Sequence, residues 1–109
     1  MRRIAAKVDA TQAPIVAALR AAGCSVTVIS APAFPDLAVG RAGRTYLLEC
    51  KAEYGPKGGG GGDLTRQQVN WWATWQGHAR VVRTPQEALI AVGLAQVAKR
   101  YADAAGGDL

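Results

Sequence analysis

The clearest pattern of apolar and polar positions lies in the middle of the chain. Two short apolar runs, Leu37–Val39 and Tyr46–Leu48, flank the turn-forming sequence Gly-Arg-Ala-Gly-Arg at residues 40–44. Two apolar runs joined by a glycine-containing turn are typical of a β-hairpin. We therefore expect an antiparallel pair of strands here, with Asp36 just before the first strand and Glu49 near the end of the second.

The hairpin determines which polar side chains meet. Side chains two residues apart on a strand share a face of the sheet, so Glu49 and Lys51 should point to one side and Cys50 to the other. Pairing of the two strands then brings Asp36 toward Glu49. Two carboxylates beside an ammonium group suit a hard divalent cation next to a lysine that positions or deprotonates water.

Patterns before the hairpin predict a helix and a strand. Apolar residues at helical spacing from Ile15 onward indicate an amphipathic helix that ends at Gly23. Because proline is tolerated only in the first turn of a helix, Pro14 makes Thr11 the expected N-cap. The alternating, β-branched residues 25–30 predict the first strand.

A second helix is expected to begin after Thr65, which forms a possible capping box with Gln68. Gln68, Trp71 and Trp75 fall on one side of this helix, so we expect two of the indole rings to pack on the sheet. Trp72 lies off that stripe, and three roles are open for it: a core residue, a dimer contact or a base-stacking platform.

After this helix the chain returns to the sheet, because residues 79–83 predict a last strand. Thr84 is the expected N-cap of a third helix, and Gly93 should weaken the middle of that helix. The apolar residues expected on or near its buried side are Leu89, Ile90, Leu94 and Val97. The predicted order is α-β-β-β-α-β-α, an α/β fold with a mixed four-stranded sheet flanked by helices.

The length and composition restrict the class of protein. A chain of 109 residues, half of them apolar, supports a single core, and we expect one domain at residues 1–101 followed by a flexible tail at 102–109. No apolar stretch is long enough to span a membrane, and no signal-peptide pattern follows Arg2 and Arg3. We therefore expect a cytoplasmic protein without a membrane partner.

Cysteine and histidine usage excludes several kinds of site. Cys24 and Cys50 have no CxxC spacing, which favours reduced, buried thiols over a disulfide or a zinc site. His78 is the single histidine, so catalytic triads and zinc sites that need spaced histidines are excluded. Any chemistry must therefore be carried by carboxylates and lysine.

The motif Pro35-Asp36 followed by Glu49-Cys50-Lys51 resembles that of the PD-(D/E)xK nuclease superfamily. Within the superfamily, the likeness is to small stand-alone VRR-NUC and Holliday-junction-resolvase-like domains. The resemblance implies a restriction-endonuclease-like core and metal-dependent hydrolysis of phosphodiester bonds in DNA, with Mg²⁺ or Mn²⁺ and no small-molecule cofactor. It extends over most of the chain, because the later elements follow in a similar order.

The resemblance also implies roles for individual residues. The implied metal ligands are Asp36, Glu49, the Cys50 backbone carbonyl and Asp9, and the implied catalytic residues are Asp36, Glu49, Lys51 and Gln68. Two assignments remain open. Asp9 either joins the metal site or caps the first helix in a capping box with Gln12. Gln68 either caps the second helix or orients Lys51 or the scissile phosphate.

The formal net charge of +5 favours a polyanionic partner, although a solvated surface explains the same surplus without one. The candidate nucleic-acid contacts are Arg41, Arg44, Lys57 and Arg66. The glycine run at residues 58–62 is either a loop that closes over a nucleic-acid strand or a tolerated flexible insertion.

The sequence therefore predicts a DNA endonuclease that selects junctions, flaps or forks rather than a base sequence. Symmetric cutting of a junction needs two active sites, so we expect a homodimer. Two other functions remain open. One is a non-catalytic nucleic-acid-binding module on the same fold, and the other is a protein-interaction domain that uses the tryptophan-rich helix.

Overall fold

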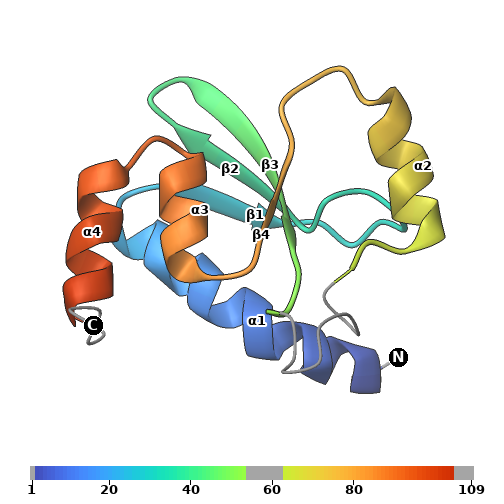
Figure 1. Cartoon of the computed structure of the whole chain (residues 1–109), viewed down its shortest axis with the longest axis horizontal. Coiled ribbons are helices and arrows are strands. Elements are labelled where there is room, and N and C mark those ends of the chain that lie inside the picture. The colour runs from blue at the N-terminus through green and yellow to red at the C-terminus, as the bar shows by residue number, and fades with distance from the viewer. Residues whose placement is uncertain (1, 54–62, 105–109) are drawn as a thin grey trace.

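The structure, a computed structural model, describes residues 2–53 and 63–104, with side chains from residue 10 onward. In chain order the elements are α1 (Arg2–Ala21), β1 (Ser25–Val28), β2 (Leu37–Arg41), β3 (Arg44–Cys50), α2 (Arg66–Thr74), β4 (Arg80–Val82), α3 (Pro85–Ala91) and α4 (Ala95–Ala104). The strands form one sheet in the order β1-β2-β3-β4 (Figure 1). Neighbours in β1 to β3 are antiparallel and β4 is parallel to β3, which confirms the expected α/β class with a mixed four-stranded sheet and flanking helices.

The predicted hairpin is present, and its register is set by a tight turn. Leu37 pairs with Leu48 and Arg41 pairs with Arg44, which leaves a two-residue loop. Both loop residues, at positions 42 and 43, have positive φ angles of 52° and 79°. Two consecutive positive φ angles match the right-handed twist of paired strands, so this turn holds the register that the site requires.

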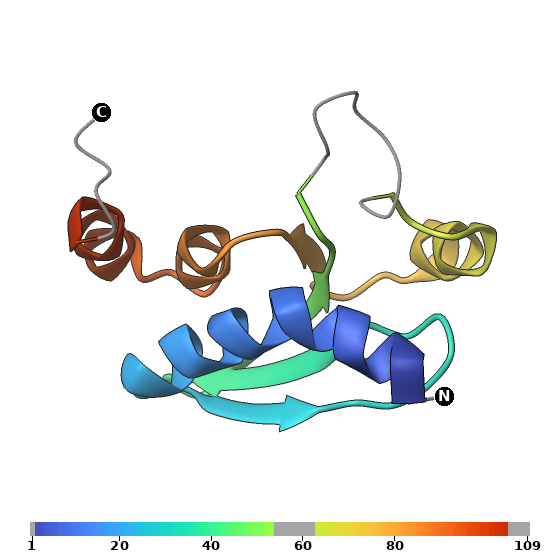
Figure 2. The same cartoon turned by 90° about the horizontal axis from the view of Figure 1, so that it is seen from below.

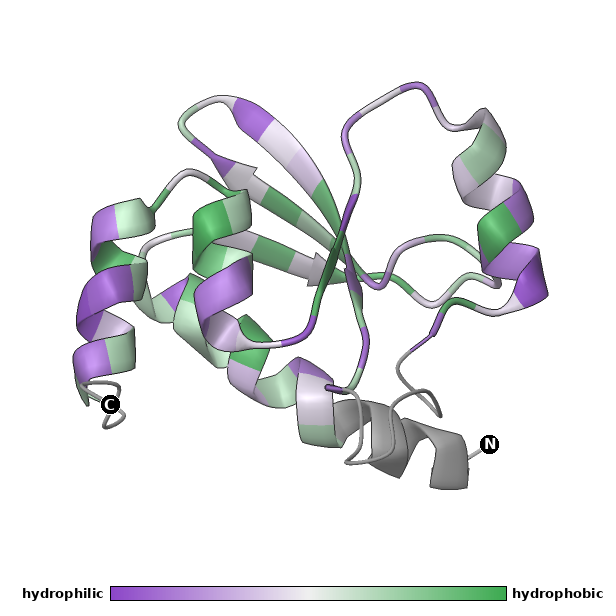
Figure 3. Ribbon diagram, viewed as in Figure 1, coloured by the Kyte–Doolittle hydropathy of each residue, from purple (hydrophilic) through white to green (hydrophobic). Residues whose placement is uncertain are grey.

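The core lies between one face of the sheet and the helices α1 and α3, with α4 packed on α3 (Figure 2). Leu37, Val39 and Leu48 point to this face and are fully buried, as are Leu19 of α1 and Leu89 of α3. Burying each such side chain contributes roughly 2 kcal/mol. Figure 3 shows the hydrophobic segments of the strands beside these helices, so the sheet is anchored from one side.

The first helix differs from the sequence prediction. It begins at Arg2 and contains Pro14 in its interior, so Thr11 is not its N-cap. A proline inside a helix costs about 3 kcal/mol. Pro14 lies on the exposed side, and the fully buried Ile15 and Leu19 hold the surrounding turns against the sheet. Tertiary packing thus overrides the local preference of proline.

The expected third helix is divided into α3 and α4. Gly93 has φ = 86°, its N–H donates to the Ile90 carbonyl at 2.9 Å, and the Leu94 N–H donates to the Leu89 carbonyl at 2.8 Å. These two bonds form a Schellman motif, which ends a helix at a left-handed glycine. Ile90 is 58% exposed, so the prediction of one continuous helix with Ile90 on its buried side is wrong.

The C-terminal helix α4 ends at Ala104, three residues into the stretch expected as a tail, and residues 105–109 lie outside the described part. Both cysteines are free and buried, as predicted, although Cys24 precedes β1 rather than lying within it. None of the helices in residues 2–53 and 63–104 is both long and apolar enough to cross a membrane.

Candidate active site

The hairpin brings Asp36, Glu49 and Lys51 together at one end of the sheet. Because Leu37 pairs with Leu48, Asp36 lies across from Glu49. The Asp36 Oδ2 atom accepts a hydrogen bond of 2.9 Å from the Cys50 backbone N–H. The Lys51 Nζ atom lies 3.7 Å from Glu49 Oε2. The strand-face argument is therefore confirmed for these three side chains.

Glu49 is the buried charged residue of the site, with only 3% of its surface exposed. Its Oε2 atom accepts a hydrogen bond of 2.7 Å from Gln68 Nε2. Its other oxygen, Oε1, is buried and has no hydrogen-bond partner among the described residues. Burial and the nearby Asp36 carboxylate raise the pKa of Glu49 to about 7, against the opposing effects of Lys51 and Gln68.

The neighbouring groups are also affected by burial. Burial raises the pKa of Asp36, while the Cys50 N–H and the Lys51 ammonium act in the opposite direction. Burial, with the charges of Asp36 and Glu49, raises the pKa of the Cys50 thiol. The Cys50 side chain lies in the core, as expected from the alternation along β3, so only its backbone faces the site.

Gln68 forms the predicted helix cap and also binds Glu49, whereas its role in orienting Lys51 or a phosphate stays a prediction. Its Oε1 atom accepts from the Thr65 N–H at 2.9 Å, and its own N–H donates to Thr65 Oγ1 at 3.2 Å, which completes the capping box of α2. This use of Oε1 leaves the amide Nε2 to donate to Glu49. The helix cap therefore orients the amide that holds the buried carboxylate.

The helix α2 lies on the opposite side of β3 and β4 from α3 (Figures 1 and 2). It has no buried residue. Trp71 and Trp75 stack on each other at 4.7 Å, and both meet the edge of Phe34 in the β1–β2 connection. The prediction that these indoles pack on the sheet is therefore wrong, because they pack on the ring of Phe34 instead.

The sequence contains a weak signal for this contact. Phe34 is the single phenylalanine of the chain and lies between Pro32 and Pro35. An aromatic residue in a stiff, proline-bounded connection is well placed to receive a helix, since little entropy remains to be lost there. Only the folded structure identifies Trp71 and Trp75 as its partners.

Two of the predicted nucleic-acid contacts lie apart from the acidic pair. Arg41 and Arg44 are at the hairpin turn, roughly 17 Å along the strands from Asp36. Arg41 Nη1 donates to the carbonyl of Val92 at 2.9 Å, so this residue has a structural contact at the end of α3. Arg66 is exposed at the start of α2.

Two candidate residues fall wholly or partly outside the described part of the chain. Lys57 and the glycine run at residues 58–62 are not described. Asp9 lies within α1, which begins at Arg2, so the alternative that Asp9 caps this helix is wrong. Its side chain is not described, and its proposed place in the metal site stays a prediction.

His78 makes an aromatic contact within the protein. Its ring meets the edge of the Tyr46 ring at 5.0 Å. Burial and the nearby Arg80 lower its pKa, which keeps the imidazole neutral at pH 7.

The donor atoms at the site fit a hard cation. Asp36 and Glu49 offer oxygen ligands, and the unpaired Glu49 Oε1 is a buried acceptor in need of a partner. Within residues 10–53 and 63–104, no group of three or more His, Cys, Asp or Glu side chains could hold a metal ion. The described part of the site therefore brings together two carboxylates, those of Asp36 and Glu49.

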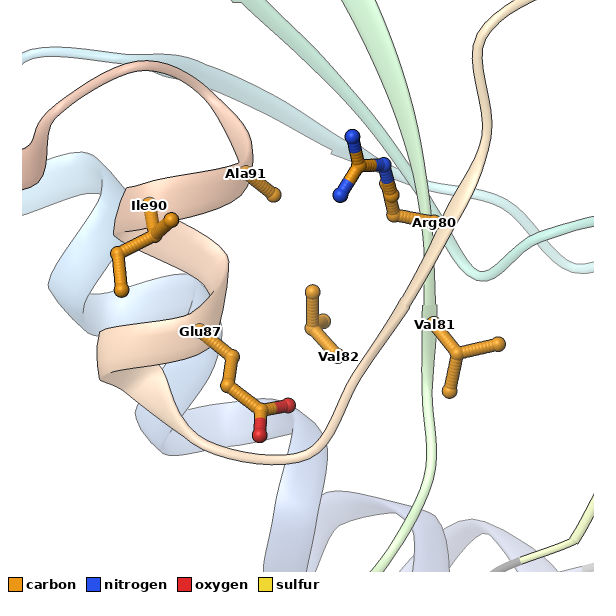
Figure 4. A pocket seen from close by; sticks show the side chains of 6 residues that line it. All are labelled: Arg80, Val81, Val82, Glu87, Ile90 and Ala91. Atoms are coloured by element: carbon orange, nitrogen blue, oxygen red, sulfur yellow. The ribbon is translucent and has the colours of Figure 1, made fainter.

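A shallow hollow of about 180 Å³ lies between β4 and α3, away from the acidic pair. In Figure 4, the side chains of Arg80 and Val82 point toward α3, whereas Val81 points to the other side. Val81 pairs with Glu49 across the parallel strands. The hollow and the carboxylates are therefore on opposite faces of the sheet.

Comparison with known proteins found no match: no family model, no curated protein and no solved structure corresponds to this chain. Function must therefore be argued from the arrangement of Asp36, Glu49, Lys51 and Gln68 itself.

Proposed function

We propose that this protein is a divalent-metal-dependent endonuclease that hydrolyses phosphodiester bonds in DNA on a restriction-endonuclease-like core. The observation that carries the proposal is the meeting of Asp36 and Glu49 with Lys51, at a point where Glu49 is 3% exposed and retains an unpaired oxygen. A bound metal ion would explain why a buried carboxylate keeps an unpaired oxygen.

A buried carboxylate with an open oxygen is costly in a protein that has no ligand there. Leaving a buried acceptor unsatisfied costs about 1–3 kcal/mol, and more when the group is charged. The Lys51 ammonium approaches Oε2 rather than Oε1, and Gln68 also binds Oε2. A cation that prefers oxygen ligands would satisfy the remaining oxygen.

In this proposal Asp36, Glu49 and the Cys50 carbonyl would hold Mg²⁺ or Mn²⁺. When bound, the metal polarises the phosphoryl oxygen and lowers the pKa of a bound water. Lys51 orients a water molecule or stabilises the charge that develops on the phosphate. Gln68 keeps Glu49 in place through its amide donor.

The charge and size of the chain indicate the kind of substrate. A net charge of +5 favours binding to phosphates without regard to base sequence. We therefore propose cleavage that depends on DNA structure, at junctions, flaps or forks, and a homodimer for paired incisions, which light scattering would detect.

The test is a cleavage assay on forked, junction and linear DNA with Mg²⁺ or Mn²⁺. We expect Asp36→Asn and Lys51→Ala each to lower the rate by on the order of 10²–10³-fold. The matched control is Asp103→Asn, which removes an exposed carboxylate from α4. Equal rates for parent, Asp36→Asn and Lys51→Ala would contradict the site assignment.

A non-catalytic nucleic-acid-binding module is the second candidate, and one observation favours it. Only two carboxylate side chains meet at the site among the described residues, fewer ligands than a metal cage of side chains alone requires. Unchanged DNA binding in EDTA, together with no heat of metal binding in calorimetry, would establish the binding module in place of the nuclease.

A further inference from the structure

The edge of the sheet at β4 leaves backbone groups open to a further strand. Within residues 2–53 and 63–104, β4 pairs with β3 on one side and ends the sheet on the other. The Val82 carbonyl accepts from the Lys51 N–H at 3.1 Å, so the peptide groups of Val82 face β3. Because the direction of these groups alternates along a strand, the N–H and C=O of Val81 face away from β3. Val81 therefore presents one donor and one acceptor at the open edge.

The next outward-facing donor on this edge is already occupied. The Arg83 N–H donates to Glu87 Oε1 at 2.8 Å. This bond agrees with the alternation, because Arg83 follows Val81 by two residues and its N–H also faces away from β3. The Glu87 carboxylate thus closes the edge at Arg83, and a strand added here is centred on Val81.

A hollow lies beside this open edge. Its volume is about 180 Å³, and its apolar lining comes from Val82, Ile90 and Ala91. Val81 also lines the hollow, although its side chain points to the other side of the sheet (Figure 4), so the hollow reaches the backbone of β4. Small-molecule pockets usually measure roughly 300–1,000 Å³. The smaller volume suits a single aliphatic side chain, and the 58% exposed Ile90 offers that side chain an apolar contact.

The charge beside the hollow indicates which sequence an added strand carries. Arg80 is exposed and points toward α3 (Figure 4), and it has no hydrogen-bond or ion-pair partner among the described residues. In an antiparallel strand, one residue opposite Val81 exchanges both backbone bonds with it. The residues opposite Arg80 and Val82 then point to the α3 side. An acidic residue fits opposite Arg80 and an apolar residue fits opposite Val82.

The helices next to β4 restrict the kind of partner. Figure 2 shows β4 between α3 on one side and α2 on the other. A folded domain that paired its own sheet edge with β4 would bring its covering layers against these helices. An extended segment has no such layers and enters between the helices. Addition of an extended segment to an open sheet edge is a recurring mode of peptide recognition.

We propose that the edge of β4 and the hollow beside it bind an extended segment of a partner protein, which pairs with Val81 as a fifth, antiparallel strand. The segment carries an apolar residue for the hollow and, two residues later, an aspartate or glutamate for Arg80. Main-chain bonds supply affinity, and these two side chains supply specificity. The hollow is on the opposite face of the sheet from the carboxylates, so this inference goes beyond the proposed nuclease function and does not depend on it.

The test begins with selection from a random heptapeptide display library, in EDTA and without DNA, on the parent protein and on Arg80→Glu. On the parent we expect enrichment of peptides with an apolar residue followed two positions later by aspartate or glutamate. On Arg80→Glu the acidic residue should be replaced by lysine or arginine, because opposite charges are favoured across paired strands. The reversal leaves the fold intact, since Arg80 is exposed and forms no ion pair in the described protein.

A peptide selected on the parent is then labelled with fluorescein and titrated by anisotropy. Ile90→Asp puts a carboxylate into the apolar hollow and should weaken binding by roughly tenfold or more, which is about 1.4 kcal/mol. Val69→Asp is the matched control, because Val69 is an exposed aliphatic residue on α2 and away from the hollow. Parent-like affinity is expected for this control.

A second pair of variants tests the strand pairing itself. Val81→Pro removes the outward N–H without removing a bond to β3, and proline is tolerated at such edge positions. We expect it to weaken peptide binding by roughly tenfold, whereas Val81→Ala keeps the N–H and should bind as the parent does. Melting temperatures show which variants are folded, and the exchange of charge between the parent and Arg80→Glu decides the question if Val81→Pro is not.

Three results would overturn the inference. The first is no enrichment on the parent, and the second is selection of the same peptides on the parent and on Arg80→Glu. The third is a dimer in light scattering that Val81→Pro dissociates, which would assign the edge to a second copy of the chain. The proposed nuclease function fails or stands separately, because peptide selection and anisotropy use neither DNA nor a metal ion.

Discussion

At the scale of single residues, Glu49 shows how much of a side chain's chemistry comes from its surroundings. The period of two along a strand is enough to place Glu49 and Lys51 on one face. The burial of Glu49, the open Oε1 atom and the bond to Gln68 depend on segments distant in sequence. Proximity of the charges could therefore be predicted, but the protonation behaviour of Glu49 could not.

The raised pKa of Glu49 predicts a pH-dependent stability in the metal-free protein. The native pKa of about 7 exceeds the ordinary value of 4.5, so between these values the native state binds a proton that the unfolded state has released. The free energy of unfolding should therefore fall as pH rises from about 4.5 to 7, by on the order of 3 kcal/mol.

Chemical denaturation in EDTA across this pH range measures the effect. The Glu49→Gln variant keeps the shape of the side chain and an acceptor for Gln68 but has no proton to release, so its stability should decline less over the same interval. The same pH dependence in parent and variant would assign the decline to other groups.

At the scale of elements, the N-terminal caps connect helix formation with the site. The threonine caps of α2 and α3 are readable from the sequence, because each threonine is followed three residues later by glutamine or glutamate. The break between α3 and α4 contains a signal of its own, Gly93, but a glycine inside an apolar helical pattern does not reveal whether it ends the helix. Its left-handed conformation and the Arg41 bond to Val92 resolve that question.

The two caps provide a matched pair of substitutions. Thr65→Ala and Thr84→Ala each remove one side-chain acceptor, from the Gln68 N–H and the Glu87 N–H respectively, so each should cost about 1 kcal/mol of stability. Only Thr65→Ala loosens Gln68, which holds Glu49. We therefore expect a roughly tenfold lower cleavage rate for Thr65→Ala and a parent-like rate for Thr84→Ala, measured well below both melting temperatures.

A similar cleavage rate for the two variants would show that the cap of α2 does not help to position the Glu49 carboxylate. A lower rate for Thr84→Ala alone would contradict the prediction that a helix cap affects cleavage through the bond between Gln68 and Glu49.

At the scale of the whole molecule, one face of the sheet is buried by α1 and α3, and the other bears the polar site with α2 beside it. This arrangement separates the two tasks of the sheet. Core packing holds the hairpin in place, and the opposite face presents Asp36, Glu49 and Lys51, the residues to which we assign the proposed chemistry. The carboxylates are thus close together because the scaffold is stable, and a ligand that binds them should in turn stabilise the scaffold.

Divalent metal ions should therefore raise the melting temperature of the parent protein, since binding to the native state alone favours that state. The shift should grow with the concentration of Mg²⁺ or Mn²⁺ and should be lost in Asp36→Asn. Thermal denaturation with a series of metal concentrations measures it, with Asp103→Asn as the control for nonspecific binding to a carboxylate. An equal shift in Asp36→Asn would place the metal elsewhere.

The sequence by itself determined the features that depend on neighbours along the chain: the hairpin, the shared face of Glu49 and Lys51, and the cap at Thr65. The turn proved shorter than the predicted residues 40–44, because Arg41 and Arg44 pair with each other. These follow from backbone periodicity and local hydrogen bonds, which act over a few residues. Only the tertiary structure decided the burial of Glu49, the contact of Phe34 with α2 and the unpaired Trp72 N–H. Those features arise where segments far apart in sequence exclude water from each other, and no local pattern records which segments will meet.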